Sequence, residues 1–226
     1  MGILAYHFNF AFVSEYWPVL LKGLLITLEL SLSAIVCATI IAIAFGILMS
    51  NKKRTIRYPV IALVDIIKSL PLLIMVLLCA YALPAFGIHV DPFWPAMIAI
   101  SIDIAAFLGD VIRGSIEGIP KGSIMAATVL GMDRQTVLKR IILPEVFREI
   151  LPSVTVFYIG VIRQSSLASV IAVYELTHTG DWIIASTYKP LEMYLVIALM
   201  YLIVILPLTM FSRRFEKSQR FKRRTI

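Results

Sequence analysis

Charge is scarce in this chain. Asp, Glu, Lys and Arg make up 15% of its 226 residues, whereas hydrophobic residues make up 60%. A soluble domain of this size carries about 25% charged residues, which keep its surface in water. Several apolar runs here instead reach the length of about 20 residues with which a helix crosses a bilayer. The composition excludes a soluble domain and predicts an all-α integral membrane protein.

The residues and motifs of common catalytic and metal sites are also missing. Cys37 and Cys79 lie inside apolar runs, where they act as small packing residues. His7, His89 and His178 are too scattered to form a metal site. The chain has no glycine-rich phosphate loop ending in Lys-Ser or Lys-Thr, no His-Glu-x-x-His and no Gly-x-Ser-x-Gly. We therefore expect no metal, no cofactor and no catalytic activity on this chain.

The apolar runs predict five spans in a single transmembrane domain that covers residues 1–226. The spans run over about residues 23–49, 58–83, 95–112, 153–173 and 191–211. Of the 21 Lys and Arg residues, 17 lie in three segments: between the first and second spans, between the third and fourth spans, and after the fifth span. Because basic residues mark the cytoplasmic ends of spans, this pattern predicts an outside N-terminus and a cytoplasmic C-terminus. The basic residues after the fifth span are interpreted as an anchor to membrane lipid headgroups, not as a nucleic-acid site.

One long polar stretch, residues 118–152, separates the third span from the fourth. Pro120 suits the first turn of a helix, and Gly131 suits the left-handed residue that closes one. Asp133 is then placed to cap a second helix, which we expect Pro144 to stop. The sequence predicts a helix, a turn and a helix on the cytoplasmic side.

Six residues of this stretch have a fixed spacing: Ala126, Ala127, Gly131, Ile141, Leu143 and Pro144. The spacing resembles the coupling loop in the permease subunits of ATP-binding-cassette (ABC) importers, where Glu-Ala-Ala, three residues, Gly and nine residues precede Ile-x-Leu-Pro. Met125 stands where that family usually has Glu. The resemblance implies that the helices around Gly131 lie in a groove of a cytoplasmic ATPase. On helix pattern alone, an ordinary amphipathic loop between two spans is the alternative.

Ionisable residues within the predicted spans are Glu29, Asp65, Lys68, Asp103, Asp110 and Arg163. Each costs about 2.5 to 3.5 kcal/mol to place in a membrane, so such residues usually face a protein interior or a wet path. Asp65 and Lys68 lie three residues apart and can pair on one helix surface. For Arg163 we expect Asp103 or Asp110 as the partner, because a buried charge left alone is costly.

Two spans contain interruptions. Pro71 loosens the second span at mid-membrane, and polar residues follow Arg163 in the fourth. The two runs, Lys68-Ser69-Leu70-Pro71-Leu72 and Arg163-Gln164-Ser165-Ser166-Leu167, resemble the Arg-Gly-Thr-Pro-Leu and Lys-Asp-Thr-Ser-Leu runs of permeases for polar amino acids. The candidate substrate pathway comprises Lys68, Ser69, Pro71, Asp103, Asp110, Arg163, Gln164, Ser165 and Ser166. Small-residue helix packing is the alternative for the serines.

The resemblance implies a permease subunit of an ATP-driven importer of a polar amino acid, with the type I importer fold, in a bacterial inner membrane. It implies as partners a second permease, identical or homologous, cytoplasmic ATPase subunits that hold ATP and Mg, and an external substrate-binding protein. A passive channel or membrane scaffold is one alternative, which would leave the coupling loop unexplained. An intramembrane hydrolase is another, but Asp103 and Asp110 are about 10 Å apart along a helix, too far for a shared-proton dyad.

Overall fold

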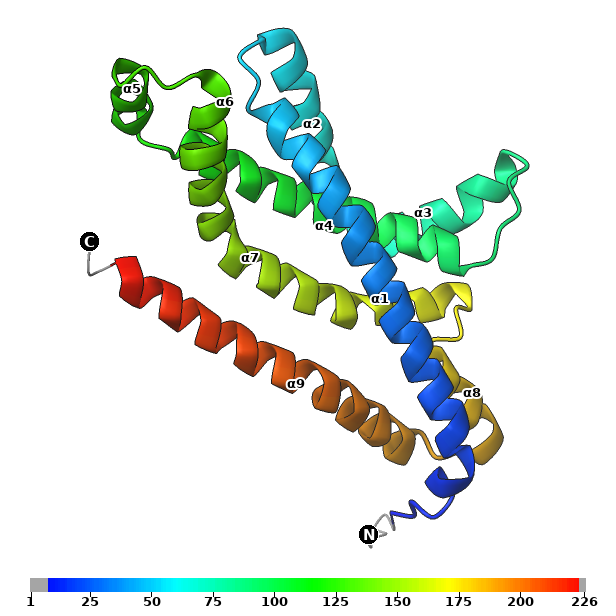
Figure 1. The fold of residues 1–226 in the computed structure, drawn as a ribbon. Coiled ribbons are helices and arrows are strands. Elements are labelled where there is room, and N and C mark those ends of the chain that lie inside the picture. The colour runs from blue at the N-terminus through cyan, green and yellow to red at the C-terminus, as the bar shows by residue number, and fades with distance from the viewer. Residues whose placement is uncertain (1–7, 224–226) are drawn as a thin grey trace, which may run out of the picture.

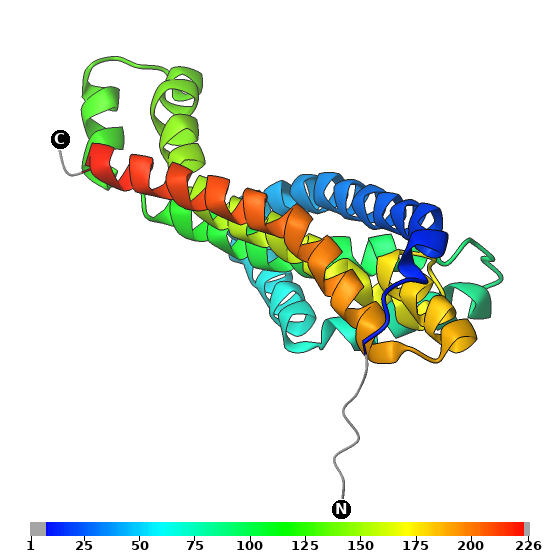
Figure 2. The ribbon, with the colours of Figure 1, turned by 90° about the horizontal axis from the view of Figure 1, so that it is seen from below.

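The computed structural model describes residues 8–223, nearly all of them in helices. Two long helices, α1 (Val13–Met49) and α9 (Pro190–Arg223), begin side by side and diverge (Figure 1). At their shared end the Asn9 amide donates a 3.3 Å hydrogen bond to Glu192 Oε1. In chain order, the elements from α1 to α9 are α2 (Arg54–Ser69), α3 (Leu72–Ala85), α4 (Phe93–Glu117), α5 (Lys121–Val129), α6 (Arg134–Val137), the π-helical η1 (Leu138–Ile142), α7 (Leu143–Gln164), the 3-10 helix η2 (Ser165–Ile171) and α8 (Leu176–Thr187). Helices α5 and α6 project from the end of the molecule where α9 finishes (Figure 2).

Four helical segments in the described residues are long and apolar enough to cross a membrane: α1, α4, Gln135–Ile171 and Pro190–Arg214. A fifth crossing is possible for α2 and α3 together, which are bent by 102°. The bend falls at Pro71, which cannot donate a backbone hydrogen bond to α2 and whose carbonyl instead accepts the first bonds of α3. The stretch predicted as the second span is therefore two helices that meet at an angle.

Helix α1 packs against α4 through a seam of small residues. Ala34, Ala38, Ala42 and Gly46 recur every four residues on α1, and all four are buried. A Cβ atom added to Gly46 would lie 2.4 Å from Ile112 Cγ2 of α4, closer than atoms can approach. Small residues let helices approach closely in lipid, where burying apolar area from water cannot drive association. The seam makes α1 and α4 the frame that positions the other helices.

The prediction that Pro144 stops the second loop helix is wrong. Helix α6 continues through η1 into α7, so that residues 135–171 form one helical segment. At the join, the Leu143 amide bonds to the Leu138 carbonyl, five residues back instead of four. This wide π-helical turn lies directly before Pro144, whose missing N–H and ring would disturb a regular α-helical turn there. As a result, the second loop helix is directly continuous with a membrane span.

Candidate functional site: a projecting loop and a broken span

The turn between α5 and α6 has the conformation that the sequence predicts. Gly131 has φ of 77°, in the left-handed region that glycine favours. Asp133 Oδ2 accepts hydrogen bonds from the amides of Gln135 (3.0 Å) and Thr136 (3.3 Å), which confirms its role as a helix cap. Hydrogen bonds from the Thr136 hydroxyl and then its amide hold the pKa of Asp133 below its ordinary value.

The projecting loop exposes apolar side chains. Met125, Val129 and Leu130, which we call the loop tip, are 68%, 88% and 79% exposed. Of the predicted coupling residues, Ala127 is buried, Ile141 is half-buried, and Ala126, Gly131, Asp133, Leu143 and Pro144 are exposed. A compact apolar surface on a projection from a membrane domain is typical of a protein docking site. The sequence motif indicated the turn, but the loop tip itself becomes visible only with the structure.

The charged residues of α2 and α4 form ion pairs near the break in the second span. Lys68 Nζ lies 3.1 Å from Asp65 Oδ1, as predicted, and 2.9 Å from Asp110 Oδ2. The other oxygen of Asp110 lies 2.7 Å from Arg113. Asp103 is 4% exposed and has no hydrogen-bond or ion-pair partner within residues 8–223. The pairing predicted between Arg163 and Asp103 or Asp110 is therefore wrong.

Arg163 fails to meet these aspartates because it faces another helix. It lines a groove of about 390 Å³ between α7 and α9, together with Ser166, Ala198, Tyr201, Leu202 and Ile205. Its side chain is exposed and forms no ion pair with the described residues. Asp110 instead pairs with Lys68 of α2. The structure thus separates the predicted pathway residues into a group at the α2–α3 break and a group where α7 becomes η2.

The serines of the predicted pathway bond to their own helices. Ser69 donates to the Asp65 carbonyl (2.7 Å), Ser165 to that of Ile162 (2.8 Å), and Ser166 to that of Arg163 (2.8 Å). Beside them, Gln164 Oε1 is buried with no hydrogen-bond partner in the part of the chain that the structure describes. A buried amide oxygen of this kind is costly unless a ligand or a partner satisfies it.

Sequence reasoning missed Tyr201, which lines the Arg163 groove. Its hydroxyl donates a 2.9 Å hydrogen bond to Glu175 Oε2. Glu175 is fully buried, accepts from the His178 amide (2.8 Å) at the start of α8, and lies 3.4 Å from the Thr27 hydroxyl of α1. One carboxylate thereby joins α1, the start of α8 and α9, and it fixes the hydroxyl of Tyr201. A single tyrosine in an apolar run gave no signal for this role.

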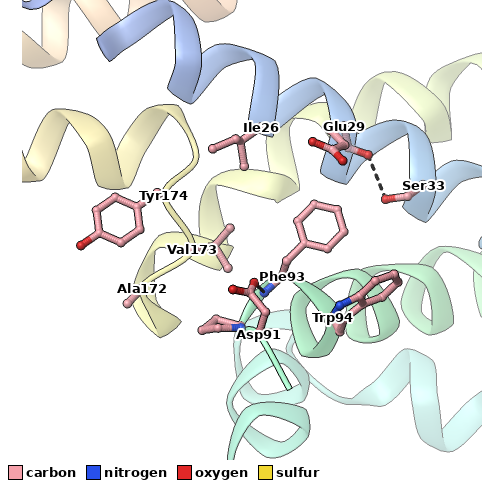
Figure 3. A pocket seen from close by; sticks show the side chains of 10 residues that line it. Ile26, Glu29, Ser33, Asp91, Phe93, Trp94, Ala172, Val173 and Tyr174 are labelled. Atoms are coloured by element: carbon pink, nitrogen blue, oxygen red, sulfur yellow. Dashed lines mark hydrogen bonds between the residues drawn. The ribbon is translucent and has the colours of Figure 1, made fainter. Parts of the chain in front are cut away.

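A larger pocket of about 710 Å³ lies between α1, the start of α4 and residues 172–174. Figure 3 shows the carboxylates of Glu29 and Asp91 and the rings of Phe93, Trp94 and Tyr174 around it. Asp91 Oδ1 accepts a 2.9 Å hydrogen bond from the Phe93 amide at the start of α4. Neither Lys nor Arg is among its lining residues, so the pocket is acidic and aromatic. It lies at the middle of α1 and at the start of α4, the opposite end of α4 from the loop that carries α5 (Figure 1).

Comparison with protein families identifies the chain. Residues 42–221, from the last part of α1 to near the end of α9, match the family described as "Binding-protein-dependent transport system inner membrane component". The chain belongs to this family. It is therefore a multi-pass inner-membrane component of a transport system, and the projecting loop lies within the matched region.

Curated relatives of this transport component are permease proteins. The L-cystine transport system permease protein TcyB of Bacillus subtilis (strain 168) is 32% identical over 204 residues, which cover 90% of this chain and 87% of TcyB. The glutamine transport system permease protein GlnP of Escherichia coli (strain K12) is 31% identical over 209 residues, which cover 90% of this chain and 95% of GlnP.

Solved structures share the fold of this transport component. An amino acid ABC transporter crystallised with histidines superposes with a TM-score of 0.86 at 26% identity, over 94% of this chain and all of that chain. The MetNI methionine ABC transporter, in an inward-facing form, superposes with a TM-score of 0.75 at 16% identity, over 91% of this chain and 98% of that chain. The fold is that of an ABC transporter permease, which confirms the predicted fold class.

Proposed function

We propose that this chain is the permease subunit of an ATP-driven importer that moves a polar amino acid across a bacterial inner membrane. The observation that carries the proposal is the projecting loop, which combines the left-handed Gly131 turn with an exposed apolar tip. A passive channel would have no use for such a docking surface. The relatives named for cystine and glutamine support an amino acid as the substrate class.

In this proposal, partner ATPase subunits supply the energy for transport. The chain carries no phosphate-binding motif, so ATP and Mg belong to cytoplasmic ATPase subunits, and this chain holds no cofactor of its own. The loop tip lies in a groove of the ATPase, as amphipathic helices do in many complexes. A second permease completes the membrane pathway, and an external binding protein delivers the amino acid.

The continuous helix from α6 to η2 gives a direct mechanical route from the loop to the pathway. Because residues 135–171 form one helical segment, a displacement that passes from the loop tip through the Gly131 turn to α6 tilts α7 as a whole. The far end of that segment carries Arg163 and Gln164, where the helix tightens into η2. Tilting there opens the pathway alternately to the two sides of the membrane.

The proposed orientation places the loop and the C-terminus in the cytoplasm and the N-terminus outside. The support is the distribution of basic residues, 17 of 21 in the segments assigned to the inner side. A reporter fused after Pro190 should lie outside the membrane. A reporter fused after Ile226 should lie in the cytoplasm. The opposite result at either site would overturn this orientation.

The substrate class is tested by uptake. We expect proteoliposomes that contain this chain with its ATPase, second permease and binding protein to accumulate at least one labelled polar amino acid when ATP is supplied. Cystine, glutamine and arginine form the first panel, with a labelled sugar as the control. Accumulation of the sugar but of no amino acid would refute the substrate class and leave the importer assignment intact.

A further inference from the structure

Helices α2 and α4 are joined by ion pairs at two separate levels. Lys68 Nζ lies 2.9 Å from Asp110 Oδ2, and Arg57 Nη2 lies 2.8 Å from Glu117 Oε1. The two contacts are eleven residues apart on α2 and seven apart on α4, or about 16 and 10 Å along the helices. Two attachment points at this spacing restrain sliding of the helices and also rotation of one against the other.

The two contacts are connected through Arg113. Its Nε and Nη2 atoms both bond to Asp110 Oδ1, at 3.0 and 2.7 Å, and its Nη1 lies 3.7 Å from Glu117 Oε2. With Asp65 beside Lys68, the network contains three cations and three carboxylates, so its formal charges balance. We call this set, Arg57, Asp65, Lys68, Asp110, Arg113 and Glu117, the charged clamp.

The charged clamp joins two elements that share only a small buried apolar contact, Val64 and Ile67 of α2 against Ala99 and Ala106 of α4. Of the sixteen residues of α2, only Val64 and Ile67 are buried. The clamp side chains are 21–38% exposed, apart from Asp65 at 60%, so they are partly shielded from water. Ion pairs that are shielded in this way are screened less by salt than fully exposed ones. The clamp therefore adds to this apolar contact in holding α2 against α4.

The position of the clamp connects the loop with the broken span. Glu117 is the last residue of α4, just before the loop that carries α5. Lys68 lies one residue before the end of α2, next to the break at Pro71. The clamp thus lies between the end of α4 that leads into the loop and the end of α2 that leads into the break.

We propose that the charged clamp couples the loop to the break between α2 and α3, so that Lys68 is a positioning residue and not a ligand of the substrate. The inference rests on the proposed transport function and extends it to a second route, beside that through α7. It also separates the two cations of the candidate pathway. Lys68 is held by two carboxylates, whereas Arg163 has no ion-pair partner among residues 8–223.

The test is a charge swap at the Arg57–Glu117 pair, which is the clamp contact nearer the loop. Arg57→Glu and Glu117→Arg should each lower amino acid uptake in proteoliposomes by about tenfold, within the usual range of a coupling free energy. Co-purification with the ATPase should stay at the wild-type level. The double variant Arg57→Glu/Glu117→Arg should recover uptake in part, above either single variant, because it restores the pair with residue 57 in reverse while Arg113 still lacks its contact with Glu117. Arg54→Glu is the matched control, since it reverses an exposed charge on the same helix that has no ion pair in the described residues.

A second measurement separates positioning from substrate binding. Lys68→Gln should lower the maximal uptake rate and leave the KM for the amino acid unchanged, and Lys68→Arg should restore the rate. A raised KM would show that Lys68 binds substrate and would overturn the assignment. Two further results would overturn the assignment. One is uptake by Arg57→Glu and Glu117→Arg equal to that of the control Arg54→Glu. The other is uptake by the double variant no higher than that of either single variant. Absence of uptake in the wild-type complex would instead refute the proposed function.

Discussion

Gly131→Val should abolish most amino acid uptake while leaving the chain inserted in the membrane. Gly131 has φ of 77°, where a β-branched residue is strained by about 1–2 kcal/mol. Nothing lies within 4 Å of the position where its Cβ would stand, so the strain comes from the backbone and not from a clash. Relief of that strain turns α5 relative to α6 and misplaces the loop tip. The measurement is uptake in cells, with membrane insertion followed by immunoblot.

Two matched variants isolate the conformation of this turn. Gly122→Val adds the same side chain on α5, where the backbone is helical and nothing lies within 4 Å, and it should transport nearly normally. Gly131→Asn should retain more uptake than Gly131→Val, because Asn tolerates the left-handed region. Wild-type uptake by Gly131→Val, with the ATPase co-purifying in full yield, would contradict the role of the turn.

Arg163→Gln should lower uptake by at least tenfold without loss of assembly. An amino acid that crosses the membrane must exchange the water around its carboxylate for other hydrogen-bond donors. Arg163 lies exposed in the groove between α7 and α9, without an ion-pair partner in the described chain, so its guanidinium is available for this purpose. Gln keeps a donor but loses the charge, which should raise the KM for the amino acid. The measurement is uptake kinetics, combined with ATPase co-purification.

The control for Arg163→Gln is Lys189→Gln, which removes a cation outside the predicted spans. Lys189 lies directly before α9, 4.8 Å from the centre of the Phe12 ring, and is not among the residues that line the groove. The rival interpretation is that Arg163 only holds helices together. In that case Arg163→Gln would lose thermal stability or ATPase association first, and any assembled complex would transport normally.

The sequence predicted local features well because local rules determine them. The left-handed turn at Gly131, the cap at Asp133 and the interruption at Pro71 each depend on the backbone preferences of one residue. The ion pair of Asp65 with Lys68 was also predictable, since three residues of helix bring the two side chains together. These features, with the loop motif, were enough to indicate the family.

Features that depend on how helices face one another were not predictable. Asp110 bonds to Lys68 and Arg113 because α4 lies against α2, whereas Arg163 faces α9. Helix spacing places a residue on a face of its own helix but does not say which helix covers that face. The continuous helix through Pro144 was missed for a different reason, since a π-helical turn accommodates a proline that would otherwise end a helix.

Uptake driven by ATP is the most direct test of the central claim, that this chain imports an amino acid with energy from a partner ATPase. The complex is reconstituted with ATP inside the proteoliposomes, on the side of the loop, and with the binding protein and labelled amino acid outside. The account predicts accumulation above the external concentration, which stops when ATP is replaced by a non-hydrolysable analogue. Equal entry of the amino acid with and without ATP hydrolysis, never exceeding the external concentration, would contradict it and identify a passive channel.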